Sequence, residues 1–249
     1  MADLRVNVAG VSFENPVIPA SGAFGFGHEY EKLYPLSRLG GISVKGMTRL
    51  PKAGNPPPRI AETPMGMLNS VGLQNPGIDH FIEKELPYLS GKGTRIIANV
   101  AGSTVEDCVA MAEKLEDTAV DMIELNISCP NVKQGGAAFG TSCEAAAGIT
   151  EAVRKATSKP LMVKLSPNVT NITAIAKAVE AAGADAVSLI NTLLGMRIDL
   201  NSRRPVLKNN VGGMSGPAVF PIAVRMVWQV ANAVKIPVVG MCGISSGKD

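Results

Sequence analysis

The sequence predicts an α/β protein of the (β/α)8-barrel type. Short aliphatic runs alternate with amphipathic helical stretches along the 249 residues, as in parallel sheets covered by helices. Hydrophobic residues make up 46% of the chain and aromatic residues only 4%, which suits aliphatic strands buried on both faces. The G-x-G-x-x-G pattern of a doubly wound dinucleotide-binding sheet does not follow the first predicted strand. We therefore expect one barrel domain over residues 1–249.

The strands can be located in chain order from their apolar runs. Residues 4–8 and 11–13 form a hairpin that turns at Ala9-Gly10. Parallel strands are then expected at residues 16–20, 41–45, 94–100, 120–126, 161–166, 186–191 and 237–241. This count is seven, whereas a closed barrel has eight. The last helix and strand eight are therefore expected to be missing from a chain that stops at Asp249, which would leave an open sheet edge.

Helices are predicted between these strands. One begins at Ser103-Thr104, with Asp107 placed to return a capping bond and an inner stripe of Val105, Cys108, Val109 and Ala112. Others cover residues 144–156, residues 171–182 before a stop at Gly183, and the stretch from Pro217, which buries Val219, Ile222, Met226, Val227 and Val230. Residues 51–58 and 195–216 are expected to be functional loops because long loops in compact domains usually serve a function.

Composition excludes several classes of protein. A net charge of +3 without a Lys/Arg run argues against nucleic-acid binding, and no apolar run approaches the roughly 20 residues of a membrane span. The four cysteines lack metal or disulfide spacing, so a reducing cytoplasm is expected. Cys108 and Cys143 are predicted to be small buried hydrophobes, and His28 and His80 to lie on the surface, outside the site.

Polar side chains gather at the predicted strand ends. Active groups of a barrel lie at the C-terminal ends of its strands, which here carry Ser21, Lys45, Asn99, Asn126, Lys164, Asn191-Thr192 and Cys242-Gly243. Any one lysine or asparagine could be a locally satisfied strand-end residue. Burying two lysines and three asparagines at one rim is costly without partners, so together they predict a ligand.

The loop at residues 126–136 carries the most reactive candidate. Cys129 lies there beside Pro130 in a polar, Gly-rich segment, where a thiol could be a nucleophile, a general base or a redox centre. The residues alone leave these three roles open. Residues 212–217 precede a helix and are predicted to cradle a phosphate, and residues 65–75 are predicted to form a substrate-binding loop.

Taken together, these segments resemble the dihydroorotate dehydrogenases. The resemblance rests on residues 19–22, 43–46, 69–75, the Cys129 loop, 163–168, 190–192 and 212–216, in the family's order along the whole chain. Cysteine at position 129 is similar to the soluble class 1 enzymes, since the membrane-linked class 2 enzymes have serine there and an N-terminal extension. Residues 132–136 resemble the NAD-linked class 1B rather than the fumarate-using class 1A.

The resemblance implies oxidation of (S)-dihydroorotate to orotate in de novo pyrimidine (UMP) biosynthesis. Cys129 would take the proton from C5 while a hydride leaves C6 for N5 of FMN. The substrate would be bound by Lys45, Asn69, Ser70, Val71, Gly72, Leu73, Asn126, Asn191 and Thr192. FMN would be bound by Ser21, Lys45, Gly46, Asn99, Asn126, Lys164, Ile190, Gly216, Cys242 and Gly243. A partner subunit with FAD and a [2Fe-2S] cluster would pass the electrons to NAD+, in a heterotetramer built on a homodimer of this chain.

Two departures from the family pattern keep alternatives open. The family has a further helix and strand with a Gly-Thr pair at the phosphate site, and it usually has glycine where this chain has Cys242. One alternative is a truncated, inactive barrel that acts only as a subunit-binding fragment. The other is a flavin barrel that acts on another dihydropyrimidine, as the reduction domain of dihydropyrimidine dehydrogenase does.

Overall fold

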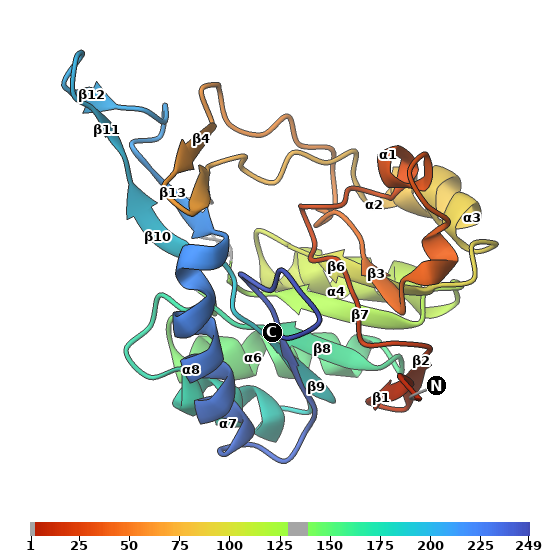
Figure 1. Ribbon diagram of the computed structural model, residues 1–249. Coiled ribbons are helices and arrows are strands. Elements are labelled where there is room, and N and C mark those ends of the chain that lie inside the picture. Colours follow the sequence, from red (N-terminus) through yellow and green to blue (C-terminus); the bar gives the residue numbers. More distant parts are fainter. Residues whose placement is uncertain (1–2, 129–138) are drawn as a thin grey trace.

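The centre of the molecule is a curled sheet of parallel strands. The computed structural model describes residues 3–128 and 139–249. Within these residues the parallel sheet has six strands in the order β14-β9-β8-β7-β6-β3, with helices packed on its outer face (Figure 1). Their bounds are β3 Gly41–Ser43, β6 Arg95–Val100, β7 Met122–Asn126, β8 Leu161–Lys164, β9 Ala186–Leu189 and β14 Val238–Gly240. This curled, helix-covered sheet is the (β/α)-barrel architecture that the alternating pattern predicts.

Six of the seven predicted parallel strands are confirmed, and the first prediction was wrong. Residues 16–20 run beside β3, where the carbonyl of Val17 accepts from Gly40 N at 3.1 Å and that of Pro19 accepts from Ser43 N at 3.3 Å. They form no strand, because Pro16 and Pro19 have no N–H to donate to a ladder.

Four helices cover the outer face, within three residues of the predicted starts. They are α4 Val105–Glu116, α6 Cys143–Ala156, α7 Ile172–Ala181 and α8 Phe220–Ala231, which follows the short η3 Pro217–Val219. Side chains of Thr104, Ser142 and Asn171 cap the first three by accepting from the backbone N–H three residues later. Gly183, at φ +95°, ends α7 as expected.

Two details of these helices differ from the predictions. The carboxylate of Asp107 returns no capping bond to Thr104 among the described hydrogen bonds, and it lies 3.7 Å from the Arg49 guanidinium instead. Cys143 is exposed rather than buried. It is the first residue of α6, whose buried face begins one turn later at Ala146.

The N-terminal hairpin closes the lower end of the barrel. It comprises β1 Val6–Val8 and β2 Val11–Phe13, as predicted. Phe13 is 1% exposed and packs against Ile97, Met122, Met162 and Ala186. These four residues come from β6, β7, β8 and β9 and face the interior, because alternate side chains of a barrel strand point inward.

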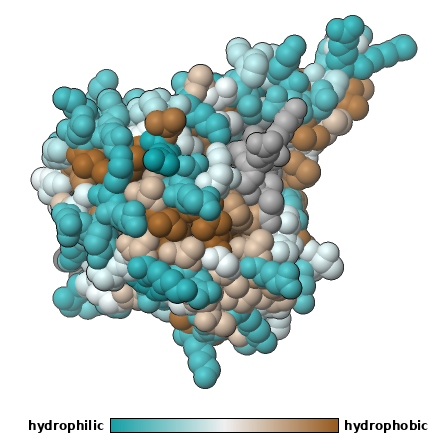
Figure 2. Space-filling view, turned by 180° about the vertical axis from the view of Figure 1, so that it is seen from behind, coloured by the Kyte–Doolittle hydropathy of each residue, from teal (hydrophilic) through white to brown (hydrophobic). Residues whose placement is uncertain are grey.

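A second sheet lies beyond the C-terminal ends of the parallel strands and is called the roof sheet here. It is antiparallel in the order β10-β13-β5-β4, with β4 Ile60–Thr63, β5 Gly66–Asn69, β10 Leu193–Met196 and β13 Val211–Ser215. A ribbon of β11 Ile198–Asp199 and β12 Arg204–Pro205 projects beyond it. Figure 2 shows this projection from behind, with hydrophobic residues along its base. The exposed Leu194, Met196 and Ile198 belong to this region.

The roof sheet corrects two loop predictions. Residues 65–75 and 195–216 contain β5, β11, β12 and β13 and parts of β10, although their glycines and polar residues are typical of loops. The sheet tolerates such a sequence because its own core is small, formed by Ala61, Leu68 and Leu207.

The remaining elements connect the hairpin and the roof sheet to the barrel. They are α1 His28–Glu31, η1 Leu36–Arg38, and a continuous helical segment built from α2 Ile78–His80, the π-helical η2 Phe81–Glu85 and α3 Leu86–Leu89. Ile78, Phe81 and Leu89 bury its inner face. In the described part of the chain, no helix has both the length and the apolar character needed to cross a membrane.

Candidate functional site

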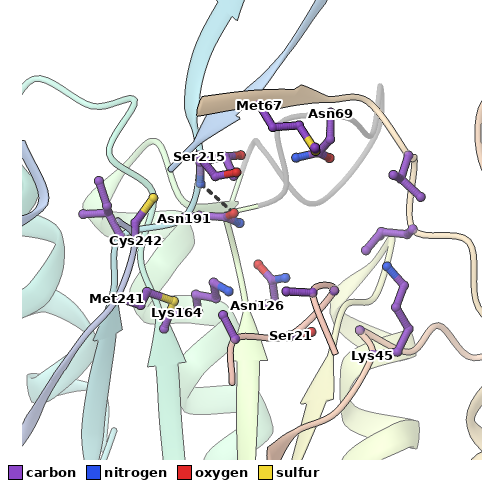
Figure 3. Close-up of a pocket in the computed structure, with 18 of the residues that line it drawn as sticks. Ser21, Lys45, Met67, Asn69, Asn126, Lys164, Asn191, Ser215, Met241 and Cys242 are labelled. Atoms are coloured by element: carbon purple, nitrogen blue, oxygen red, sulfur yellow. Dashed lines mark hydrogen bonds between the residues drawn. The ribbon is translucent and has the colours of Figure 1, made fainter. Parts of the chain in front are cut away.

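A cavity of about 350 Å³ lies between the C-terminal ends of the parallel strands and the roof sheet. Figure 3 shows side chains entering it from both sides, from the strand ends below and from β5 and β13 above. Most predicted site residues line it. These are Ser21, Lys45, Gly46, Asn69, Val71, Gly72, Leu73, Asn126, Lys164, Ile190, Asn191, Thr192, Cys242 and Gly243. Residues that the sequence places on seven separate segments therefore meet around one cavity.

Three described residues of the predicted site are not among those that line the cavity, and the predicted base Cys129 lies outside the described residues. Ser70 is fully buried, and its hydroxyl has no hydrogen-bond partner among the described residues. Asn99 is fully buried. Gly216 lies behind the lining residue Gly243, since a Cβ added to Gly243 would meet the Gly216 carbonyl oxygen at 2.9 Å.

Several lining residues were not named individually as site residues, although residues 65–75 and 212–217 were predicted as binding segments. They are Ala20, Gly22, Ala23, Ile60, Met67, Ser215 and Met241. Met67 and Ser215 belong to strands of the roof sheet, which were read as loops. Their side chains alternate with those of neighbouring residues along β5 and β13, and this period of two was the signal that could have located them.

Lys164 is the buried charge of the cavity. It ends β8 and is only 4% exposed, and within the described residues its ammonium makes no hydrogen bond or ion pair. A buried ammonium is costly unless an anion compensates it. Burial raises the pKa of the neighbouring Cys242 thiol, and a hydrogen bond with the Gly216 backbone and the Lys164 charge only partly oppose this shift. The arrangement favours an anionic group beside Lys164.

Lys45 faces the cavity from the opposite wall (Figure 3). It follows β3, and its backbone N–H donates to the Gly25 carbonyl at 3.0 Å. Its ammonium lies 3.8 Å from the position that a Cβ on Gly22 would occupy. Gly22 itself has φ +89°, a conformation that favours glycine. Two ammonium groups therefore enter the cavity from opposite sides.

Amide and hydroxyl groups complete the polar lining. Asn126 ends β7, and Asn191 follows β9. The Asn191 amide donates to Ser128 Oγ at 2.7 Å, and its oxygen accepts from Thr192 N at 2.8 Å. From the roof sheet, Asn69 donates to the Gly213 carbonyl at 3.3 Å. With the two lysines, these groups suit an anionic ligand that also has amide-type donors and acceptors.

The backbone approaches the cavity closely where side chains are small. A Cβ on Gly46 would lie 2.8 Å from Asn99 Oδ1, and one on Gly243 would lie 2.7 Å from Phe220 Cβ. Gly212 and Gly213, predicted as a phosphate cradle, instead belong to β13. A Cβ on Gly213 would overlap Thr192 Oγ1 at 1.9 Å, so this glycine permits close packing of the roof sheet.

Sequence comparison identifies the family. The family model described as "Dihydroorotate dehydrogenase" matches residues 3–249. The chain belongs to the dihydroorotate dehydrogenase family. It is 57% identical to the "Dihydroorotate dehydrogenase B (NAD(+)), catalytic subunit" of Alkaliphilus metalliredigens, over 99% of this chain and 82% of that protein. The proteins of the same name from Thermoanaerobacter pseudethanolicus and Geobacillus sp. strain WCH70 are 58% and 56% identical, over 99% and 100% of this chain and 82% and 80% of theirs.

The two histidines lie away from the cavity of this dihydroorotate dehydrogenase family member, as expected. His28 and His80 are on the surface, with side chains 49% and 46% exposed, and their Nε2 atoms lie 2.6 and 3.2 Å from the Glu85 carboxylate. Sequence reasoning missed a different charged residue, Glu124 of β7, which is 1% exposed below the cavity. The available signal was a single acidic residue inside an otherwise apolar strand, two positions before Asn126.

Proposed function

We propose that this chain oxidises (S)-dihydroorotate to orotate in de novo pyrimidine (UMP) biosynthesis, as the catalytic subunit of an NAD+-linked dihydroorotate dehydrogenase. The observation that carries the proposal is the convergence of Lys45, Lys164, Asn69, Asn126 and Asn191 on one cavity in a member of this family. Relatives that are 56–58% identical carry that name.

The substrate has chemistry that these side chains can recognise. Dihydroorotate has a carboxylate, which the Lys45 ammonium would bind through a charge-assisted hydrogen bond. Its ureido edge has alternating donors and acceptors, which Asn69, Asn126 and Asn191 with Thr192 would match. Residues 70–73 would surround the ring, with Val71, Gly72 and Leu73 on the cavity wall.

The residues around the cavity also suit FMN. Ser21, Gly46, Lys164, Cys242 and Gly243 would hold it, and Ile190 and Asn126 would contact it from the wall, with Asn99 and Gly216 behind them. FMN, when bound, supplies the acceptor for the hydride that leaves C6. The Lys164 ammonium would stabilise the negative charge that develops there, since fixed charges in a site sheltered from water act strongly on a transition state.

Cys129 would be the general base that removes the C5 proton. The residues just before it support this role, because Asn126 and Ser128 are held at the strand end. The Asn126 oxygen accepts from Ser128 N at 3.2 Å and from Ser128 Oγ at 2.8 Å. A general base must lie within hydrogen-bond reach of the proton that it removes. A fixed end of β7 just before Cys129 would help to hold the thiol at that distance.

The electron acceptor would be NAD+, reached through a partner. We infer a partner subunit with FAD and a [2Fe-2S] cluster, in a heterotetramer built on a homodimer of this chain in the cytoplasm. The words "catalytic subunit" and "NAD(+)" in the relatives' name support a partner subunit and NAD+ as the acceptor. The free thiols of Cys108, Cys143 and Cys242 suit a reducing compartment.

Reduction of the bound flavin tests the proposed function. The purified chain is loaded with FMN under anaerobic conditions and mixed with dihydroorotate or, separately, with dihydrouracil. Bleaching of the visible flavin band by dihydroorotate alone is the expected result. Bleaching by dihydrouracil would favour the reaction on another dihydropyrimidine. A folded chain that binds no FMN would contradict the proposal and favour the subunit-binding fragment.

A further inference from the structure

Glu124 is a buried carboxylate below the cavity that has no role in the proposed reaction. It is 1% exposed and lies two residues before Asn126 on β7, so both side chains face the barrel interior. It accepts hydrogen bonds from Ser43 Oγ at 2.6 Å, Asn99 Nδ2 at 2.5 Å and Ser188 Oγ at 2.6 Å. These donors come from β3, β6 and β9. Hydrogen bonds to both carboxylate oxygens offset the cost of burial.

A continuous line of hydrogen bonds joins Glu124 to the cavity. Asn99 Nδ2 donates to Glu124, and Asn126 Nδ2 donates to Asn99 Oδ1 at 3.4 Å, the longest link. Ser128 Oγ donates to Asn126 Oδ1 at 2.8 Å, and Asn191 Nδ2 donates to Ser128 Oγ at 2.7 Å. We call Glu124, Asn99, Asn126, Ser128 and Asn191 the amide relay. Every donor in it points toward Glu124.

The carboxylate and the backbone N–H of Ser128, which donates to Asn126 Oδ1 at 3.2 Å, together determine this direction. A side-chain amide has a donor on one side and an acceptor on the other, and turning it over exchanges the two. Glu124 offers Asn99 only an acceptor, so Asn99 turns its NH2 group downward and its oxygen toward Asn126. Asn126 must then donate to Asn99 and accept from Ser128. Backbone groups fix the Asn191 amide, because it donates to the Ser128 carbonyl at 3.3 Å and accepts from Thr192 N at 2.8 Å.

We propose that Glu124 is a positioning residue for substrate binding. Through Asn99 it supports the edge that the Asn126 amide turns toward the ring, and with it the hydrogen bonds between Asn126 and Ser128, the residue before Cys129. The inference rests on the proposed function, because it assumes a ring with a ureido edge in the cavity. A dihydropyrimidine presents N–H and C=O groups in a fixed order. If a site asparagine turned its amide over, its NH2 group would face an N–H of the ring instead of a C=O.

Ser188 provides a matched control within the same buried layer. It is fully buried and donates to Glu124 Oε1, whereas Asn99 and Ser43 donate to Oε2. Replacing Ser188 by alanine removes one hydrogen bond of the same carboxylate and leaves the amide relay intact. Glu124→Gln is the conservative variant: its amide oxygen can accept from Asn99 while its NH2 group donates to Ser188, because a serine hydroxyl can also accept.

The test is the dissociation constant of orotate, measured by calorimetry on the FMN-loaded chain. FMN content and the thermal unfolding midpoint report whether each variant is folded. Glu124→Leu and Ser128→Ala are expected to weaken orotate binding about tenfold or more with FMN retained, since a mispaired amide in a dry site loses at least that factor. Glu124→Gln is expected to restore most of the affinity, and Ser188→Ala to leave it unchanged.

Three results would overturn the inference. The first is wild-type affinity in Glu124→Leu, whatever the affinity of Ser128→Ala. The second is a Glu124→Gln variant as weak as Glu124→Leu, which would assign the effect to charge instead of direction. The third is an equal loss in Ser188→Ala. Should Glu124→Leu fail to fold, Glu124→Ala takes its place and is expected to weaken orotate binding in the same way. A wild-type chain that binds FMN but not orotate would refute the proposed function instead.

Discussion

At the scale of single residues, the proposed chemistry depends on a base and a buried cation. Replacing Cys129 by serine leaves a side chain of similar size whose hydroxyl is a far weaker base near neutral pH. We expect the rate of flavin reduction by dihydroorotate to fall by about 100-fold or more, with orotate affinity little changed. Rapid-mixing spectroscopy of the FMN-loaded chain measures this rate. An unchanged rate at neutral pH would remove Cys129 from the role of base.

Lys164 is tested through binding of the cofactor. Lys164→Met keeps the buried hydrocarbon and removes the ammonium that lacks a counter-ion among the described residues. The FMN dissociation constant is expected to rise by about tenfold or more, because a charge-assisted interaction in a buried site is lost. Lys177→Met on the exposed side of α7 is the control. Equal FMN affinity in both variants would contradict an anion beside Lys164.

At the scale of elements, Glu116 joins the end of α4 to the segment before β8. Hydrogen bonds from the Ser158 and Thr157 hydroxyls and from Ser158 N lower the pKa of Glu116 from 4.5 to about 2. The pKa of Glu116 is lower in the folded chain than in the unfolded chain. The stability that its hydrogen bonds add is therefore complete above about pH 4.5 and is lost as the pH falls toward 2. We expect Glu116→Gln to lower the free energy of unfolding near neutral pH. We also expect this free energy to fall less steeply with decreasing pH than in the wild type.

Urea unfolding at a series of pH values measures this effect. Glu113→Gln, on the exposed side of the same helix, is the matched control and should keep the wild-type acid dependence. A Glu116→Gln variant with the wild-type slope between about pH 5 and pH 3 would show that these hydrogen bonds do not persist in solution.

Two glycines should respond to alanine in opposite directions. A Cβ on Gly213 of β13 would lie 1.9 Å from Thr192 Oγ1, so Gly213→Ala should force the roof sheet away from Thr192 and lower stability by about 1–3 kcal/mol. A Cβ on Gly148 of α6 meets nothing within 4 Å, so Gly148→Ala should raise stability by about 0.5–1 kcal/mol. Thermal unfolding of the two variants checks both signs.

At the scale of the whole molecule, the N-terminal hairpin is expected to stabilise the barrel as a plug. Phe13→Ala would open a hole against the interior faces of β6 to β9 and lower stability by about 3–5 kcal/mol. Leu200, 85% exposed on the projecting ribbon, provides the control, since Leu200→Ala should change stability little. Chemical denaturation of both variants measures the difference, and similar midpoints would show that the hairpin contributes little.

Much of this architecture could be predicted because the barrel has a strong periodic signal. Six parallel strands and four helices were located from apolar runs and caps, and the lysines and asparagines at the strand ends do meet around one cavity. The misses have local causes. Pro16 and Pro19 lie in an apolar run yet cannot complete a ladder, and Cys143 precedes the buried face of its helix.

The roof sheet and Glu124 could not be read from local sequence for a different reason. The roof strands gain their order from pairing across long sequence separations and not from their own composition. Glu124 is one acid among apolar neighbours, and its role as a buried acceptor depends on hydrogen-bond donors that three other strands supply. Patterns within a short window carry neither kind of information.

The roof sheet also bears on the order in which the molecule folds. Asn69 of β5 pairs with Gly213 of β13, and a side-chain bond of the same pair crosses 144 residues. Contacts between residues this far apart in sequence form late in folding. The chain must lose the entropy of closing a long loop before the contact stabilises the fold. A chain emerging from the ribosome would complete most of its parallel sheet first, and the upper wall of the cavity would close only after β13 had been synthesised.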